Sequence, residues 1–291
     1  IYGFLGPNGA GKSTTMNIMT GYLGATEGQV LIDGHDILKE PEEAKKNIGY
    51  LPEIPPLYME MTVREYLEFA AELKGIKKDK REPQIEEVIR LAKLRDVENR
   101  LIQNLSKGYK QRVGLAQAVL GFPEIIILDE PTVGLDPKQI IEIRELIRKL
   151  AKKHTVILSS HILAEVREVC DYIMIISGGK LVASDTTENL ENMMSGKGQI
   201  EVEAKASRDE MDHIIRRTGK IKEVKYRTSA SGITTAQITA KGGEDIREEL
   251  FLAFSHADVP MLTLNQSKTT LEEIFLELTQ GSGNRMIKEE K

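Results

Sequence analysis

One octapeptide restricts the possible folds more than any other feature of this chain: Gly6-Pro7-Asn8-Gly9-Ala10-Gly11-Lys12-Ser13. It matches the pattern G-x-x-x-x-G-K-[ST] at every defined position. The apolar residues 1–5 before it are typical of a buried strand, and a helix is expected over about 12–22. In such a turn the backbone N–H groups and the helix N-terminus surround a phosphate group. We therefore predict a phosphate-binding loop in which Lys12 contacts phosphate and the Ser13 hydroxyl binds Mg²⁺.

Strand and helix patterns alternate as far as about residue 190, which favours a parallel sheet with helical crossovers. We expect buried strands over 125–128, 155–159 and 172–176. Residues 63–105 have helical periodicity throughout and predict a helical subdomain over about 63–120. The expected fold is α/β, with a first domain over 1–193. Because a domain seldom begins inside a core strand, we also expect residues upstream of Ile1.

A second domain is predicted over 199–280, after a plausible linker at 194–198. Its expected elements are strand 199–204, helix 207–218, strands 221–228 and 232–240, helix 244–257 and strand 260–266, before a final helix over 270–279. The order βαββαβ is typical of a small ferredoxin-like α+β domain. This part contains no cluster of catalytic residue types, so we interpret it as a packing or regulatory module.

Composition excludes several classes of function. The net charge is −5, from 40 basic and 45 acidic residues, so no overall positive field attracts nucleic acid or anionic lipid. The single cysteine, Cys170, excludes an intrachain disulfide and fits a buried apolar position in a reducing compartment. No apolar run reaches 18 residues, so any role at a membrane must come through a partner protein.

Asp129 and Glu130 directly follow the apolar run 125–128. An aspartate at the carboxyl end of a central strand is well placed to hold Mg²⁺, and Glu130 could polarise an attacking water as general base. An acidic pair after a strand is more often a turn or a helix cap. The phosphate-binding loop in the same sheet favours the functional interpretation.

Two further positions gain meaning from the predicted topology. Ser106 and Gly108 begin a helix, which gives the chain a second helix start able to bind an anion, although by itself this would be an ordinary cap. His161 follows strand 155–159 and should emerge at the same edge of the sheet as Asp129, where it could hydrogen-bond a terminal phosphate. A lone histidine is more often structural.

These elements, in this order, resemble the nucleotide-binding domain of ABC transporters over roughly residues 1–190. The resemblance implies that 6–13 is Walker A, 125–129 is Walker B, 105–112 is the signature, 134–136 is the D-loop and 48–53 is the Q-loop. It implies that the catalytic residues are Glu130, His161 and Lys12. It further implies Mg²⁺ ligands at Ser13, Asp129 and Glu53, and ATP contacts at Gly6, Pro7, Asn8, Gly9, Ala10, Gly11, Lys12, Ser13, Thr14, Glu53, Ser106, Gly108 and Asp136.

The chain departs from the family pattern at three places. Glu53 stands where the family usually has glutamine, and Lys107 and Tyr109 replace one glycine and the glutamine of LSGGQ, while Ser106 and Gly108 remain. The aromatic residue that stacks on adenine lies upstream of Walker A in the family, and that segment is not in this sequence. The variant signature and the ending 271–279 look most like a bacterial exporter subgroup with separately encoded permeases, named for gliding motility and for sodium or drug export.

The resemblance implies an ATP-hydrolysing transporter subunit at the cytoplasmic face of the cell membrane. Its implied partners are a second copy of the chain, closed head to tail on ATP, and an integral membrane permease. One alternative is a soluble ABC-type ATPase in translation or DNA repair, although the chain shows neither two such domains nor a long coiled coil. Another is a regulatory subunit that only binds nucleotide, which Glu130 argues against.

Overall fold

The computed structural model describes residues 1–193, 199–229, 232–267 and 275, and the chain divides into two compact units. The described residues of the first unit are 1–185, and the second begins at Thr186. The predicted first domain extended to residue 193 and so included α8 (Thr187–Met193), which groups with the second unit. Strand β8 (Lys180–Thr186) runs directly into α8, so no turn residues mark the boundary. The predicted linker 194–198 and, apart from residue 275, the predicted helix 270–279 lie outside the described residues.

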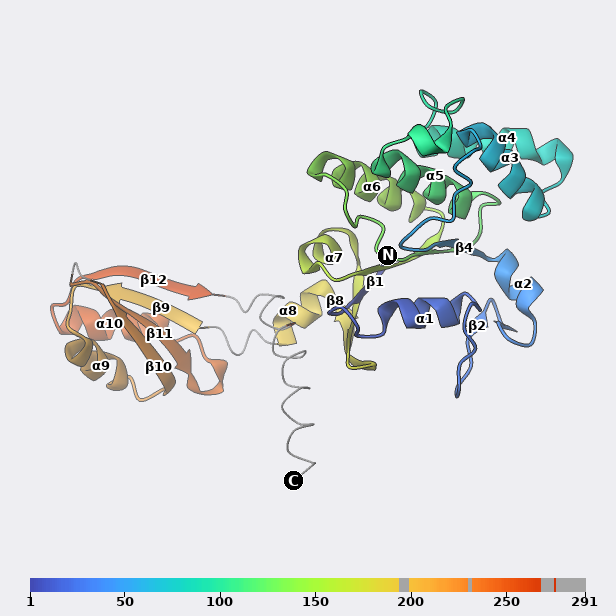
Figure 1. Ribbon diagram of the computed structural model, residues 1–291. Coiled ribbons are helices and arrows are strands. Elements are labelled where there is room, and N and C mark those ends of the chain that lie inside the picture. The colour runs from blue at the N-terminus through green and yellow to red at the C-terminus, as the bar shows by residue number, and fades with distance from the viewer. Residues whose placement is uncertain (194–198, 230–231, 268–274, 276–291) are drawn as a thin grey trace. The chain divides into compact units, whose positions relative to one another are not determined.

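The first unit is built on a six-stranded sheet with the order β4-β5-β6-β1-β7-β8 (Figure 1). Its strands besides β8 are β1 (Tyr2–Leu5), β4 (Ile48–Leu51), β5 (Ile125–Leu128), β6 (Thr155–Ser160) and β7 (Tyr172–Ser177). The pairs β4–β5, β5–β6, β6–β1 and β1–β7 are all parallel. This confirms the α/β fold, because parallel neighbours require crossover connections of the kind that the alternating pattern predicted.

The register of the sheet brings several chain segments together at one edge. Leu5 pairs with Ser160, Leu128 with Leu158 and Leu51 with Leu128, so these strands end side by side. The segments that follow them are the glycine-rich loop, the acidic pair, the loop with Glu53, and His161. Loops at the carboxyl edge of a parallel sheet commonly form binding sites.

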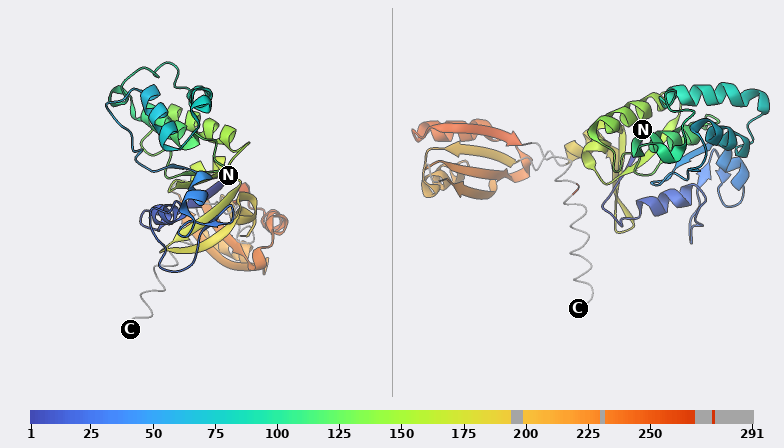
Figure 2. Two further views of the ribbon diagram at one scale, coloured as in Figure 1. Left: turned by 90° about the vertical axis from the view of Figure 1, so that its right-hand side faces the viewer. Right: turned by 45° about the horizontal axis from the view of Figure 1, so that its top comes forward.

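Helices cover both faces of this sheet (Figure 1, Figure 2). Met16 of α1 (Lys12–Met19) is fully buried on one face, against Phe4 and Ile127. The opposite face is covered by α5 (Lys107–Val119), α6 (Pro137–Leu150) and α7 (Leu163–Val169). A hairpin of β2 (Leu31–Ile32) and β3 (His35–Asp36), followed by α2 (Pro41–Lys46), completes this part.

The helical subdomain consists of α3 (Val63–Leu73), α4 (Lys78–Leu91), a short 3-10 turn at Ile102–Asn104, and α5. Helix α3 begins with a capping box, in which Thr62 and Glu65 each accept a hydrogen bond from the backbone of the other. Apolar side chains at helical spacing, including Leu67, Ile85 and Ile89, are fully or almost fully buried. Packing of these faces explains why the stretch is helical rather than a further βα repeat.

Cys170 is buried, as its apolar surroundings in the sequence predicted, with 7% of its surface exposed. Its Sγ packs over β1, where a Cβ added to Gly3 would lie 2.7 Å away. Burial raises the pKa of the Cys170 thiol to about 12. The thiol is therefore protonated at neutral pH and serves as an apolar packing group.

The second unit contains a four-stranded sheet with the order β10-β11-β9-β12, in which each neighbouring pair is antiparallel. Alternate strand residues such as Ile200 and Val202 pack with Ile215, Leu250 and Phe254 of the two helices. This βαββαβ arrangement confirms the ferredoxin-like prediction. Its elements are β9 (Gln199–Ala204), α9 (Arg208–Arg216), β10 (Ile221–Thr228), β11 (Thr234–Ala240), α10 (Arg247–His256) and β12 (Met261–Ser267).

No helix in the described part of the chain combines the length and the apolar character of a transmembrane span.

Candidate functional site

The glycine-rich loop has the backbone geometry of a phosphate cradle. Gly9 and Gly11 have φ angles of 79° and 103°, in the left-handed region that glycine adopts most readily. Gly6 is required for a different reason, because an added Cβ would lie 2.5 Å from the carbonyl oxygen of Ile176. The loop therefore turns tightly from β1 into α1, with the first turn of that helix beside it.

A cavity of about 560 Å³ lies against this loop and is lined by residues that follow several different strands. Glu53 follows β4, Glu130 follows β5 and His161 follows β6. Sequence positions far apart in the chain thus share one cavity, as the parallel topology predicted. Its lining residues are Asn8, Gly9, Gly11, Lys12, Ser13, Thr14, Glu53, Glu130, Val133 and His161.

Lys12 supplies a buried positive charge at the centre of the cavity. Its Nζ donates to the carbonyl oxygens of Gly6 and Pro7 at 2.9 Å and 3.4 Å. It also lies 3.4 Å from Glu130 Oε1, and both side chains are only 7% exposed. A buried charge must be paired and hydrogen-bonded to be tolerated, and this lysine is both.

Glu130 is held on two sides. Its Oε2 lies 3.0 Å from His161 Nδ1, while Oε1 faces Lys12. The residue has φ of +47°, an unusual conformation for a side chain other than glycine. Such strain tends to persist where the surroundings fix the backbone, often at functional sites. The arrangement suits a carboxylate that must keep one orientation while it accepts a proton.

Asp129, the residue before Glu130, is 3% exposed. Its Oδ1 accepts a hydrogen bond from Ser159 Oγ at 2.5 Å, and the same Oγ accepts from the backbone N–H of Glu130 at 2.8 Å. Ser159 therefore joins the ends of β5 and β6 and fixes both acidic residues. The sequence analysis missed Ser159. The only available signal was a hydroxyl residue at the end of an otherwise apolar strand.

The oxygen ligands in this region fit a magnesium ion bound together with a phosphate. No group of three or more His, Cys, Asp or Glu side chains that could hold a metal occurs among the described residues. Mg²⁺ does not need one, because it usually binds one or two protein oxygens together with substrate phosphates and water. Ser13 and Glu53 line the cavity. Asp129 does not line the cavity, and its Oδ1 is hydrogen-bonded to Ser159. It directly precedes Glu130, which does line the cavity, so we expect the Asp129 carboxylate to lie close to the ion.

The helix start at Ser106 is separate from the cavity. Ser106 is exposed and caps α5, its Oγ accepting from the N–H of Tyr109 at 3.4 Å. Asp136 similarly caps α6 and accepts from the N–H of Gln139 at 2.9 Å. Gly108 is buried beneath Gln139, since an added Cβ would lie 2.5 Å from that side chain. None of Ser106, Gly108 and Asp136 lines the cavity of the phosphate loop.

Lys107, one of the departures from the family pattern, lies over the loop that precedes α6. A Cβ added to Gly134 would be 2.1 Å from Lys107 Nζ. Gly134 itself has φ of +70°. A side chain at position 134 would therefore be strained by the backbone conformation, and the flexible end of Lys107 would have to move aside.

Comparison with known proteins agrees with this fold. A sequence profile of the family described as "ABC transporter" matches residues 1–133. The bacitracin transport ATP-binding protein BcrA of Bacillus licheniformis is 42% identical over 193 residues, an alignment that covers 66% of this chain and 62% of BcrA. The linearmycin resistance ATP-binding protein LnrL of Bacillus subtilis (strain 168) is 31% identical over 279 residues, covering 96% of this chain and 89% of LnrL.

A solved structure of an ATP-binding cassette is also similar to this chain. The ATP-binding cassette MJ0796, described as a dimer in a post-hydrolysis state bound to ADP and Pi, is 28% identical with a TM-score of 0.58. The match covers 64% of this chain and 84% of that chain. The chain belongs to the family of ABC transporter ATP-binding proteins and has the ABC ATPase fold.

Proposed function

We propose that this chain is the ATP-hydrolysing subunit of a bacterial ABC exporter. The observation that supports this most is the convergence of Lys12, Glu130 and His161 on one cavity beside the phosphate loop. These side chains match the needs of phosphoryl transfer, in which positioning and charge neutralisation do most of the work. The wider family membership makes ATP the expected nucleotide.

The proposed reaction is in-line attack of water on the γ-phosphate of ATP, in which the bond from the γ-phosphorus to the bridging oxygen breaks and ADP leaves with that oxygen. Phosphate oxygens replace Glu130 as the partner of Lys12, and the N–H groups at the start of α1 donate to the same phosphates. Mg²⁺, held near Ser13, Asp129 and Glu53, would neutralise charge on the phosphates. Release from Lys12 leaves Glu130 free to accept the proton of the water. His161 retains its position beside Glu130 and donates to the γ-phosphate.

We further propose that a second copy of the chain completes the site. Ser106 is exposed at the start of a helix and does not line the cavity of its own chain. A phosphate bound by Ser106 would therefore not be the phosphate that residues 6–13 of the same copy bind. A head-to-tail dimer would bring Ser106 of one copy over the nucleotide of the other. The description of the similar cassette as a dimer supports this arrangement.

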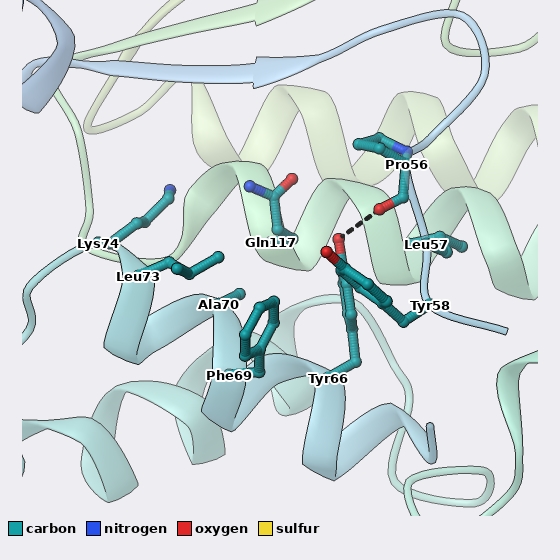
Figure 3. Close-up of a pocket in the computed structure, with 9 residues that line it drawn as sticks. All are labelled: Pro56, Leu57, Tyr58, Tyr66, Phe69, Ala70, Leu73, Lys74 and Gln117. Carbon is teal, nitrogen blue, oxygen red and sulfur yellow. Dashed lines mark hydrogen bonds between the residues drawn. The ribbon is translucent and has the colours of Figure 1, made fainter. Parts of the chain in front are cut away.

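A second cavity supports contact with a membrane partner. It measures about 510 Å³ and lies between the helical subdomain and the segment after β4 (Figure 3). Tyr58 and Phe69 meet edge to face with ring centroids 5.2 Å apart, and Tyr66 donates its hydroxyl hydrogen to the Pro56 carbonyl at 3.2 Å. The remaining lining residues are Leu57, Ala70, Leu73, Lys74 and Gln117. This largely apolar groove is suited to an apolar segment of a permease.

The transport assignment rests on the relatives and on this groove. BcrA and LnrL are named for bacitracin transport and linearmycin resistance, which makes export the favoured direction. The cytoplasmic face of the membrane is then the expected location, through the permease. The alternative, a soluble ATPase in translation or repair, predicts that the chain sediments with ribosomes or nucleic acid rather than with membranes.

Leu73→Asp tests the permease contact. Leu73 is 71% exposed at the groove, so a charge there should leave folding and basal ATP hydrolysis intact but weaken binding to membranes that contain the permease. We expect at least about a tenfold loss of binding to inverted membrane vesicles from the source organism, because the charge loses its hydration in an apolar contact. Leu31→Asp, at a position 52% exposed on the β2–β3 hairpin, is the matched control. Equal binding by both variants would exclude the groove.

A further inference from the structure

A buried carboxylate lies behind the proposed catalytic residues and takes no part in the mechanism described above. Glu165, in the first turn of α7, is 7% exposed. Its Oε2 accepts a hydrogen bond from Thr132 Oγ1 at 2.5 Å and another from Ser160 Oγ at 3.2 Å. Arg144 of α6 approaches its other oxygen at 3.8 Å. A single side chain therefore connects the loop after β5, the end of β6 and helix α6.

Two of the three segments that Glu165 connects carry a residue of the candidate site. Thr132 lies in the turn immediately after Glu130, whose carbonyl accepts from the N–H of Val133 at 3.2 Å. Ser160 directly precedes His161, and its Oγ also accepts from the N–H of Ile162 at 3.0 Å. Thr132 and Ser160 are themselves 6% and 1% exposed, so little can move without breaking these bonds.

Stability alone does not explain a carboxylate at this place. Burying a charge is costly even when it is well paired, and apolar residues of similar volume are often as stable or more stable. Arg144 would keep a partner without Glu165, because it also pairs with the carboxylate of Glu168. An apolar side chain could not hold the loop after β5 and the end of β6 at a fixed distance through hydrogen bonds.

We propose that Glu165 is a positioning residue that fixes the distance between Glu130 and His161. This proposal rests on the proposed ATP hydrolysis. Glu165 acts through Thr132 on the loop of Glu130 and through Ser160 on the loop of His161. Small misplacement of reacting groups lowers the rate of chemistry strongly while ground-state binding changes little. Glu165 should therefore affect kcat far more than the KM for ATP.

The test replaces the hydrogen-bonded pair by apolar residues of similar size. In the double variant Thr132→Val with Glu165→Leu, no hydroxyl remains on Thr132, and Ser160 Oγ loses its acceptor but still accepts from the N–H of Ile162. We expect a folded protein with a moderately lower Tm, ATP affinity close to wild type and a kcat per folded molecule lower by about 10- to 100-fold. Wild-type kcat in the folded double variant would overturn the proposal.

A second comparison remains decisive if the double variant does not fold. Thr132→Val removes one donor with almost no change of shape, and Thr132→Ser keeps the donor. We expect Thr132→Val to lower kcat about tenfold and Thr132→Ser to restore most of the rate. Equal rates for both would overturn the positioning role. A purely structural role would change Tm and leave kcat per folded molecule unchanged.

One further readout separates this proposal from the proposed function. ATP hydrolysis by wild type and by Glu130→Gln is measured in the same assay. If wild type hydrolyses ATP and Glu130→Gln loses this activity, the proposed hydrolysis is supported independently of Glu165. In a His161→Ala background, the Thr132→Val effect should shrink, because the positioned group is gone. If the effects of His161→Ala and Thr132→Val on kcat are fully additive, only the role of Glu165 is overturned. Absence of turnover in wild type overturns both proposals.

Discussion

Glu130→Gln is expected to bind ATP with close to wild-type affinity and to hydrolyse it about 10² to 10⁴ times more slowly. The substitution keeps the shape of the side chain and removes the group that accepts the proton from water. His161 can still hydrogen-bond the amide oxygen at the position of Glu130 Oε2, which lies 3.0 Å from Nδ1. The geometry of the cavity should therefore survive.

The measurement pairs phosphate release with equilibrium binding of a fluorescent ATP analogue. Loss of hydrolysis with retained binding is the expected result. Glu124→Gln is a suitable control, because this carboxylate lies at the opposite end of β5, away from the cavity. Hydrolysis by Glu130→Gln within about threefold of wild type would contradict its role as general base.

Lys12→Ala should instead weaken ATP binding strongly. The variant loses charged hydrogen bonds to the phosphates, each of which contributes about 1.5–3 kcal/mol, so ATP affinity should fall by at least about 10- to 100-fold. Hydrolysis at fixed ATP would fall with it. The contrast with Glu130→Gln separates a residue that binds the substrate from one that acts on it.

Lys12→Ala also has a cost in stability. It leaves the Glu130 carboxylate, 7% exposed, without the ammonium that lies 3.4 Å away. Removing one of the two partners of a buried carboxylate is unfavourable, and only His161 remains beside it, so Tm should fall. Lys12→Met in combination with Glu130→Gln removes both charges and should recover most of the lost Tm without recovering ATP binding. Recovery of binding in that double variant would contradict the role of Lys12.

Much of the cavity could be predicted because it depends on topology. Once β1, β5 and β6 are recognised as parallel neighbours, the residues after them must lie at one edge. Walker-type spacing then identifies Lys12, Glu130 and His161 without knowledge of side-chain packing. The same reasoning correctly predicted the ferredoxin-like order of the second unit, where the elements alternate in a regular way.

The supporting contacts could not be predicted because they depend on register. Asp129 meets Ser159 only because Leu128 pairs with Leu158, and a slip by one residue would bring a different side chain beside it. Glu165 reaches Thr132 through the packing of α7, which no local pattern encodes. Ser159 and Glu165 contact the segments that carry Glu130 and His161.

The helix start at Ser106 also differs from what the sequence pattern alone suggests. Ser106 and Gly108 are neighbours in the pattern, yet the first is exposed and the second is buried beneath Gln139. A phosphate from another copy could therefore reach Ser106 directly, but Gln139 must move before it reaches the backbone at Gly108. Closure of two copies would have to include this movement.

The proposed mechanism requires that each ATP is enclosed by the phosphate loop of one copy and the helix start at Ser106 of another. The most direct measurement is ATP hydrolysis by an equal mixture of two inactive variants, Lys12→Ala and Ser106→Arg. Mixed dimers contain one intact pair, with Lys12 from one copy and Ser106 from the other. We predict that the mixture recovers clear activity when neither variant does alone. If each variant is folded and their mixture stays inactive at every protein concentration, the shared site is contradicted.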